Sequence, residues 1–328
     1  MSTPASALSK ISQISRPSVS EFAADVRAGL TKPQKELHSK YFYDELGSAL
    51  FEAITHLPEY GLTRADERLL HAHALDIATF IATPCAVVEL GSGTGKKTRS
   101  ILTALKPASE RLRFFPIDVS ADALAYCAHD LADVAEVHPL EQSYLDGMAA
   151  ATAERKSGES LLVLFLGSTI GNFERPCAAE FLRSLSHRLQ AGDALLVGAD
   201  LVKNRERTLA AYDDPTGLTA AFNLNVLGRI NRELGADFEL RNFEHQATWN
   251  ETERRIEMHL RSRKDQTVSI ADAALTVHFQ SGETIWTESS HKFHVQEMAE
   301  LASQTGFRMA AQWVDQEWPF VESLWTVR

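Results

Sequence analysis

The first two thirds of the chain alternate between short apolar runs and longer segments with apolar residues at helical spacing. The apolar runs are rich in Val, Leu, Ile and Phe and fall at 85–95, where the run ends in glycines, and at 111–118, 161–168 and 194–201. The segments with helical spacing fall at 63–83, 96–106 and 178–189, and Ser120 is placed to cap a further helix. Apolar strands separated by amphipathic helices predict an α/β fold with a parallel sheet covered on both faces. The helix at 63–83 is expected to open with a capping pattern formed by Thr63 and Asp66.

After Asp200 the pattern changes. Helices are expected within 205–235, and charge-rich segments that alternate apolar and polar positions then predict antiparallel strands at 243–250, 254–263, 267–270, 275–279 and 284–290. A helix at 295–305 and strands at 307–314 and 319–327 are expected to return the chain to the edge of the first sheet. The middle of the chain is therefore expected to form a second layer, or a lobe of its own.

Charge and cysteine content exclude several classes of partner. The 328 residues carry 33 Lys and Arg against 44 Asp and Glu, a net charge of −11 that would repel a nucleic-acid backbone. The three cysteines form no Cys-x-x-Cys pair and the 12 histidines show no ligand spacing, so we expect a reducing compartment and no metal. No stretch approaches the roughly 20 apolar residues that span a bilayer, and no signal peptide is evident. We expect a cytoplasmic protein without membrane contact.

A glycine-rich loop, Gly91-Ser-Gly93-Thr-Gly95, follows a predicted strand and precedes a predicted helix, the setting of a cofactor loop. It lacks the third glycine of the dinucleotide motif and the Gly-Lys-Ser/Thr ending of a triphosphate loop. The acids Glu89 and Asp118 suit a ligand with a cationic centre and a ribose diol, as in S-adenosylmethionine. A turn without a ligand is the alternative for the loop, and a turn or helix-capping aspartate is the alternative for Asp118.

Six blocks of the sequence form a recognisable set: YFYDELGSALFEAITHLPEYGLTRAD (41–66), VVELGSGTGKKTR (87–99), FLGSTIGNF (165–173), the long block 200–238, RRIEMHL (254–260) and TIWTESSHKF (284–293). In this order and at similar spacings, they resemble the histidine Nα-methyltransferases of ergothioneine biosynthesis. The resemblance implies a Rossmann-like, seven-stranded class I methyltransferase domain at 64–202 plus 292–328. It also implies a second, α+β substrate-binding domain at 13–63 plus 203–291, after a flexible N-terminus at 1–12.

The resemblance assigns site residues by position. Residues implied to bind S-adenosylmethionine are Gly91, Lys97, Asp118, Ser143 and Tyr144. Residues implied to hold the amino acid are Tyr43, Tyr60, Asn172 and Tyr212 at its backbone end, of which Tyr60, Asn172 and Tyr212 orient the reacting amine, and Met258, Glu288 and Ser290 at its imidazole. The family commonly has Asp before an aromatic residue at the adenine position, where this chain has Gln142-Ser143-Tyr144.

Several of these residues have a plainer interpretation when taken singly. Lys97 could simply be a solvated lysine on a helix, and Tyr60 a packed aromatic residue. Asn172 could be a turn residue that follows glycine. Glu288, on an alternating strand, would ordinarily face solvent. As a set, they outline two polar ends separated by a gap of imidazole size.

The implied reaction is the transfer of three methyl groups to the α-amino nitrogen of L-histidine, giving hercynine, the first step of ergothioneine biosynthesis. Glu288 is expected to provide the selectivity for histidine. Tyr43 and Phe51 are expected to contact the increasingly methylated ammonium through cation–π interactions. A monomer is expected, and the proton acceptor stays open. The alternatives are an N-methyltransferase of another amino acid such as tryptophan, an NAD-dependent oxidoreductase, and a catalytically silent partner protein that keeps the fold.

Overall fold

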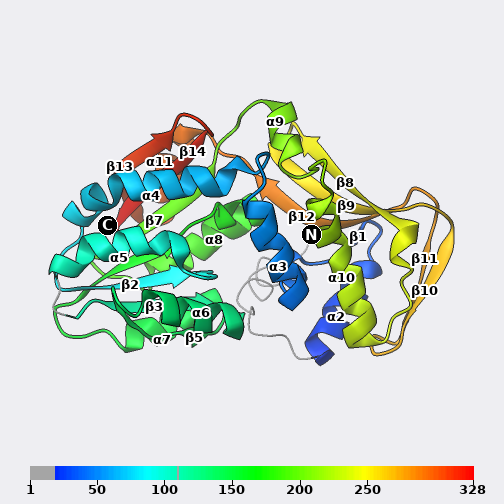
Figure 1. Ribbon diagram of the computed structural model, residues 1–328, viewed down its shortest axis with the longest axis horizontal. Coiled ribbons are helices and arrows are strands. Elements are labelled where there is room, and N and C mark those ends of the chain that lie inside the picture. Colours follow the sequence, from blue (N-terminus) through cyan, green and yellow to red (C-terminus); the bar gives the residue numbers. More distant parts are fainter. Residues whose placement is uncertain (1–18, 109–110) are drawn as a thin grey trace. The chain divides into compact units, whose positions relative to one another are not determined.

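The computed structural model describes residues 19–108 and 111–328, so the expected flexible segment 1–12 lies outside the described residues. The described chain folds into two compact units (Figure 1). One contains residues 62–202 and 292–328, and the other contains 19–61 and 203–291. Each unit is therefore built from two separate stretches of sequence.

The first unit has one sheet with strand order β13-β14-β7-β6-β2-β3-β4, and β5 pairs with β3. All neighbouring strands are parallel except β14, which is antiparallel to both β7 and β13. The strands are β2 (Cys85–Leu90), β3 (Arg113–Asp118), β4 (Glu136–Val137), β5 (Leu140–Glu141), β6 (Ser160–Phe165), β7 (Ala194–Asp200), β13 (Phe307–Asp315) and β14 (Phe320–Val327). The predicted parallel sheet and the return of the chain to its edge are both confirmed.

Helices cover both faces of this sheet because its central strands are apolar on both sides (Figure 1). One face carries α4 (Gly61–Thr79), α5 (Arg99–Leu105) and α6 (Ala121–Leu131), and the other carries α7 (Tyr144–Ala153), α8 (Arg175–Ser186) and α11 (Val295–Gln304). The 3₁₀ turns are η2 (Lys96–Thr98), η3 (Lys106–Ala108) and η4 (Thr169–Asn172). Ser120 caps α6 as predicted, since its hydroxyl accepts from the Ala123 N–H at 3.3 Å.

The capping pattern expected for Thr63 and Asp66 is wrong. Helix α4 begins at Gly61, so both residues lie inside it. Asp66 is fully buried and accepts a hydrogen bond from the Lys97 ammonium instead of a helix N–H.

The second unit has a sheet with strand order β1-β12-β9-β8 and a separate pair, β10 and β11. All pairings are antiparallel except β1 with β12, where Lys35 lies opposite Ile285. The strands are β1 (Lys35–Glu36), β8 (Phe243–Asn250), β9 (Arg255–Ser262), β10 (Gln266–Ile270), β11 (Leu275–Phe279) and β12 (Thr284–His291). The helices and turns are α2 (Val19–Leu30), η1 (Ser39–Phe42), α3 (Glu45–Thr55), α9 (Arg205–Ala210), α10 (Leu218–Leu234) and η5 (Leu240–Asn242). The five predicted antiparallel strands are confirmed.

The long segment 203–291 leaves the first unit and rejoins it at neighbouring points. Leu201 and Phe293 form a parallel β-bridge, and the Val202 N–H donates to the Phe293 carbonyl at 3.0 Å. Beside them, the fully buried Lys292 ammonium pairs with the Asp200 carboxylate at 2.9 Å. The departing and returning segments of the chain are thus held together within the first unit.

Candidate active site

The glycine loop lies at the carboxyl end of β2, where ligands bind in open parallel sheets. Gly91, Gly93 and Gly95 all have positive φ, at 74°, 51° and 69°. A Cβ on Gly95 would lie 2.5 Å from the Cys127 sulfur. Only glycine meets both the backbone and the packing requirement there, which explains the composition of the loop.

Asp118 ends β3, and its carboxylate reaches the glycine loop. Oδ2 accepts from the Gly93 N–H at 2.9 Å, and Oδ1 accepts from the Val119 and Ser120 N–H groups at 2.7 and 3.0 Å. The side chain therefore has the turn role that the sequence left open and also fixes the glycine loop. Three of about four acceptor positions are filled, so one is left for a ribose hydroxyl.

Lys97 and Glu89 anchor the turn η2 that follows the loop. The Lys97 ammonium donates to Asp66 Oδ2 at 2.5 Å, so the interpretation of Lys97 as a solvated helix lysine does not hold. Glu89 is buried, and its Oε2 accepts from the Thr98 hydroxyl at 2.6 Å. Burial raises the pKa of Glu89 to about 8.

Ser143 and Tyr144 begin helix α7. The Ser143 hydroxyl caps the helix, since it accepts from the Asp146 N–H at 3.2 Å and donates to Asp146 Oδ2 at 2.6 Å. The Tyr144 hydroxyl lies 3.0 Å from the position that a Cβ on Gly91 would take. Tyr144 thus borders the glycine loop, whereas the Ser143 hydroxyl has only an acceptor lone pair left for an adenine amino group.

Asn172 belongs to the first unit, with the cofactor residues. It ends η4, in the turn that follows β6. Ser168 shapes this turn, because it has a positive φ of 58° and its hydroxyl accepts from the Asp200 N–H at 2.9 Å. The half-buried Asn172 amide makes no hydrogen bond to another described residue, so its donors and acceptor are available to a ligand.

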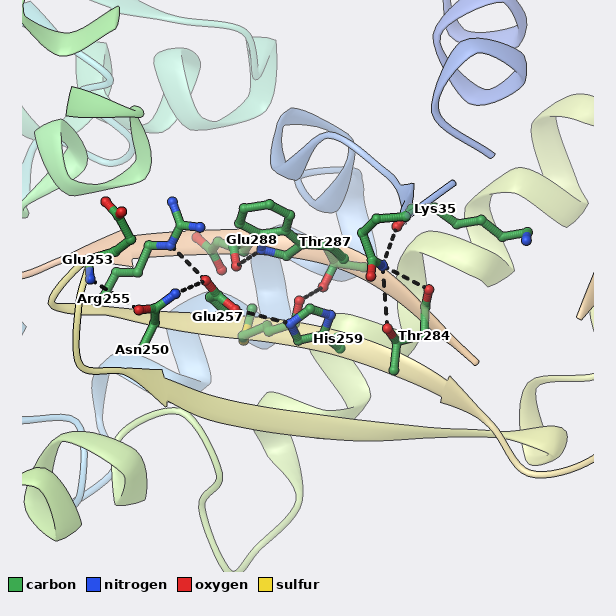
Figure 2. A network of polar contacts seen from close by, with 12 residues as sticks. Lys35, Asn250, Glu253, Arg255, Glu257, His259, Thr284, Thr287 and Glu288 are labelled. Carbon is green, nitrogen blue, oxygen red and sulfur yellow. Dashed lines mark hydrogen bonds and ion pairs between the residues drawn. The ribbon is translucent and has the colours of Figure 1, made fainter. Parts of the chain in front are cut away.

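A β-bulge in β12 decides where Glu288 points. Trp286 lies opposite His259 on β9, but the register then shifts and Glu288 lies opposite Met258. Cross-strand partners project from the same face of a sheet, so Glu288 shares the face of the buried Met258. The extra residue, Thr287, donates its hydroxyl to the Met258 carbonyl at 2.9 Å, which holds the bulge (Figure 2).

Ser290 and the tyrosines lie on the same side of this sheet. Beyond the bulge, Ser290 lies opposite the buried Ile256, and its hydroxyl is 2.8 Å from the Tyr212 hydroxyl. The rings of Tyr60 and Tyr212 meet edge to face with centroids 6.2 Å apart. Phe51 links Tyr60 to Tyr43, at 6.2 and 5.6 Å between ring centroids.

His245 and Asn223 hold Tyr212 in place, and the sequence analysis missed both. His245 Nε2 donates to the Tyr212 carbonyl at 2.7 Å, and its Nδ1 accepts from the Asn223 amide at 2.9 Å. These partners fix one neutral tautomer, and burial lowers the pKa of His245. Its alternating position on β8, opposite Leu260, was the available signal.

We expect His245→Ala to lower the free energy of unfolding by about 1–3 kcal/mol, because two buried polar partners lose their contact. The lowered pKa also makes stability depend on pH. This contribution is fully present above the unfolded pKa of 6.5 and is lost as the pH falls through the lower folded value.

Urea unfolding between pH 5 and 8 measures both effects. The variant should lose less stability than the wild type on acidification, although His259, whose pKa burial also lowers, keeps part of the dependence. His278→Ala, at an exposed strand position, is the control. An unchanged acid profile in His245→Ala would contradict the neutral, buried histidine.

The opposite face of the sheet carries a polar network. Figure 2 shows Asn250 and Arg255 converging on Glu257, whose Oε1 accepts from their side chains at 2.9 and 2.8 Å. The Arg255 guanidinium also lies over the Trp286 ring, 4.6 Å from its centroid. Without the bulge, Glu288 would join Trp286 and Glu257 on this face.

The structure places the assigned residues in two groups. The five cofactor residues and Asn172 lie in the first unit, and Tyr43, Tyr60, Tyr212, Met258, Glu288 and Ser290 lie in the second. Within residues 19–108 and 111–328, no cluster of His, Cys, Asp or Glu is suited to hold a metal ion. No helix in this part of the chain is long and apolar enough to cross a membrane.

Comparisons with known proteins identify the family. A family model described as a histidine-specific, SAM-dependent methyltransferase matches residues 22–327. A histidine N-alpha-methyltransferase of Mycolicibacterium smegmatis is 45% identical over 305 residues, which cover 92% of this chain and 93% of that protein. One from Mycobacterium tuberculosis is 43% identical over 301 residues, with 92% and 93% covered. Ergothioneine biosynthesis protein 1 of Neurospora crassa is 34% identical over 203 residues, 61% of this chain and 23% of that protein.

The family match confirms S-adenosylmethionine as the cofactor, and the mostly parallel sheet with helices on both faces agrees with the predicted Rossmann-like class I methyltransferase fold. These matches speak against the two alternatives of an NAD-dependent oxidoreductase and a catalytically silent partner protein. The chain belongs to the S-adenosylmethionine-dependent, histidine-specific methyltransferases.

Proposed function

We propose that this enzyme transfers three methyl groups from S-adenosylmethionine to the α-amino nitrogen of L-histidine, forming hercynine for ergothioneine biosynthesis. The observation that carries the choice of histidine is the bulge in β12. It aligns a carboxylate, Glu288, and a hydroxyl, Ser290, on the face that also presents Tyr212. An imidazole offers these groups an N–H donor and a nitrogen acceptor, which an apolar side chain does not.

The residues of the first unit fit the cofactor. The bare backbone at Gly91, against the Tyr144 hydroxyl, forms a surface that a Cβ would fill. Asp118 retains an acceptor for ribose, and Lys97 stands beside the loop as a fixed positive charge. We assign this unit as the methyltransferase domain and the second unit as the substrate-binding domain.

Bound S-adenosylmethionine supplies an electrophilic methyl group, and the protein's task is mainly to align the attacking amine with it. We assign this orientation to Asn172, Tyr60 and Tyr212. Tyr212 is fixed at both ends, by Ser290 at its hydroxyl and by His245 at its carbonyl, so it offers a pre-set hydrogen-bonding position. The amine must shed a proton before each attack, and the aromatic group of Tyr43, Phe51 and Tyr60 suits the ammonium that results.

Mass spectrometry of histidine incubated with the protein and S-adenosylmethionine tests the proposal. We expect stepwise products with one, two and three added methyl groups, all on the α-amino nitrogen. Phenylalanine should react slowly, because its side chain has no donor for the Glu288 carboxylate.

Faster turnover of tryptophan than of histidine would favour the second candidate, an N-methyltransferase of another amino acid. We also propose that the enzyme is a cytoplasmic monomer that acts on this small molecule and binds neither nucleic acid nor membrane. Size-exclusion chromatography with light scattering checks the oligomeric state.

A further inference from the structure

Two buried carboxyl groups face each other in the first unit, and one of them contacts Lys97, a residue assigned to the cofactor. Asp66, on α4, has no solvent exposure, and Glu322, on β14, is 1% exposed. Their carboxyl groups are within hydrogen-bonding reach of one another. Among the described residues, Asp66 Oδ1 and both oxygens of Glu322 receive no hydrogen bond.

Two ionised carboxylates cannot form such a contact, because neither has a donor and their charges repel. A buried acceptor without a donor also costs about 1–3 kcal/mol, and more when it is charged. One proton held between the two groups removes the repulsion and leaves a single negative charge. It also gives Asp66 Oδ1 a donor, so that the one oxygen still without a donor is a neutral carbonyl of Glu322.

The other contacts of Asp66 show which group stays ionised. Asp66 Oδ2 accepts from the Lys97 ammonium at 2.5 Å and from the Gly167 N–H at 3.0 Å. Glu322 has no such donors, and its Oε1 lies 2.7 Å from where a Cβ on Gly198 would be, so the bare backbone of β7 covers it closely. The negative charge therefore belongs on Asp66, opposite Lys97.

We propose that Glu322 is a positioning residue that keeps its proton at neutral pH and donates it to Asp66 Oδ1. Burial and the neighbouring Asp66 both raise the pKa of Glu322, and Lys97 opposes them only in part. With this hydrogen bond from Glu322, Asp66 connects two segments of the chain. It fixes Lys97 after the glycine loop and Gly167 in the turn that leads to Asn172.

This inference rests on the proposed function only in assigning Lys97 to the cofactor site. We therefore test it by the affinity for S-adenosylhomocysteine, measured by calorimetry, which does not depend on the amino acid methylated. Glu322→Gln keeps the volume and an N–H donor, so its affinity should stay within about twofold of the wild type. Glu322→Ala removes the donor, and Asp66→Asn removes the charge opposite Lys97, so each should lose tenfold or more.

Infrared spectroscopy reports the proton directly. The wild-type protein at neutral pH should show a carboxylic-acid carbonyl band that Glu322→Gln lacks. The difference between the two spectra cancels any contribution from Glu89, which both proteins share. Glu300→Gln, at an exposed position on α11, is the matched control and should keep the band.

Three results would overturn the proposal. One is a Glu322→Gln protein that is unfolded, or that binds as weakly as Glu322→Ala, because then the charge of Glu322 would be required. The second is an Asp66→Asn protein with wild-type affinity. The third is a difference spectrum without a carboxylic-acid band. None of these results would bear on histidine methylation, which mass spectrometry tests separately.

Discussion

Replacing Asp118 with alanine is expected to reduce the affinity for S-adenosylhomocysteine by about 1.5–3 kcal/mol, or roughly 10- to 150-fold. The loss has two sources. The ribose loses a charged acceptor, and the glycine loop loses the hydrogen bond from the Gly93 N–H to Asp118 Oδ2. Calorimetric titration measures the affinity, and thermal unfolding shows whether the fold is kept.

Two further variants separate these sources. Asp118→Asn can still accept from Val119 and Ser120 through its carbonyl oxygen, but its amide cannot accept from Gly93, so an intermediate loss is expected. Asp122→Ala removes an exposed acid from the first turn of α6 and should bind normally. Unchanged affinity in Asp118→Ala would mean that Asp118 is only a turn residue and that the ribose does not bind to it.

Replacing Glu288 with glutamine is expected to weaken histidine binding by about 1.5–3 kcal/mol, because the hydrogen bond from the imidazole loses its charged acceptor. Cofactor affinity should hardly change, because Glu288 lies in the second unit and the cofactor residues lie in the first. The penalty against side chains without a donor should also shrink, so the ratio of kcat/KM for histidine over phenylalanine should fall.

Steady-state kinetics with both amino acids measure the two effects together. Glu244→Gln provides the control, since this residue is on the same sheet but forms surface ion pairs with Arg261 and Arg263. A Glu288→Gln enzyme with wild-type kcat/KM and selectivity would mean that this carboxylate does not meet the imidazole.

Most of the fold could be predicted because the first sheet is apolar on both faces. The runs 85–90 and 161–165 are buried at every position, and a pattern of that kind admits few structures other than a covered parallel strand. Helices α2, α3 and α7 and the two-residue strand β1 were not predicted. Pairing of β1 with β12 joins residues some 250 positions apart in the sequence, and no local pattern signals such a contact.

In the candidate site, the periodicity of the sequence predicts the wrong face of the sheet for a key residue. A regular strand has a period of two, which would place Trp286, Glu288 and Ser290 on one face. The bulge breaks this rule, and no pattern of residue types specified it. The family resemblance pointed to Glu288, but only the register shows which face of the sheet it occupies.

Buried polar contacts were also beyond the reach of the sequence. Asp66 looked like part of a helix cap because Asp is common there, yet its partner is Lys97, 31 residues away. His245 lies on a strand whose residues alternate in burial, and its partners Asn223 and Tyr212 come from separate parts of the chain. Such groups are assigned by three-dimensional pairing, which propensity does not encode.

The bridge between Leu201 and Phe293 has a consequence for protein engineering. Because the bridge holds the two ends of segment 203–291 side by side, we expect that this segment can be exchanged between relatives without moving β7 or α11, to which it connects. The strand β1 adds a condition, since the sheet of the second unit borrows it from the N-terminal stretch. A chimera designed to methylate a different amino acid should therefore take both segment 203–291 and the N-terminal stretch that contains β1 from the same relative.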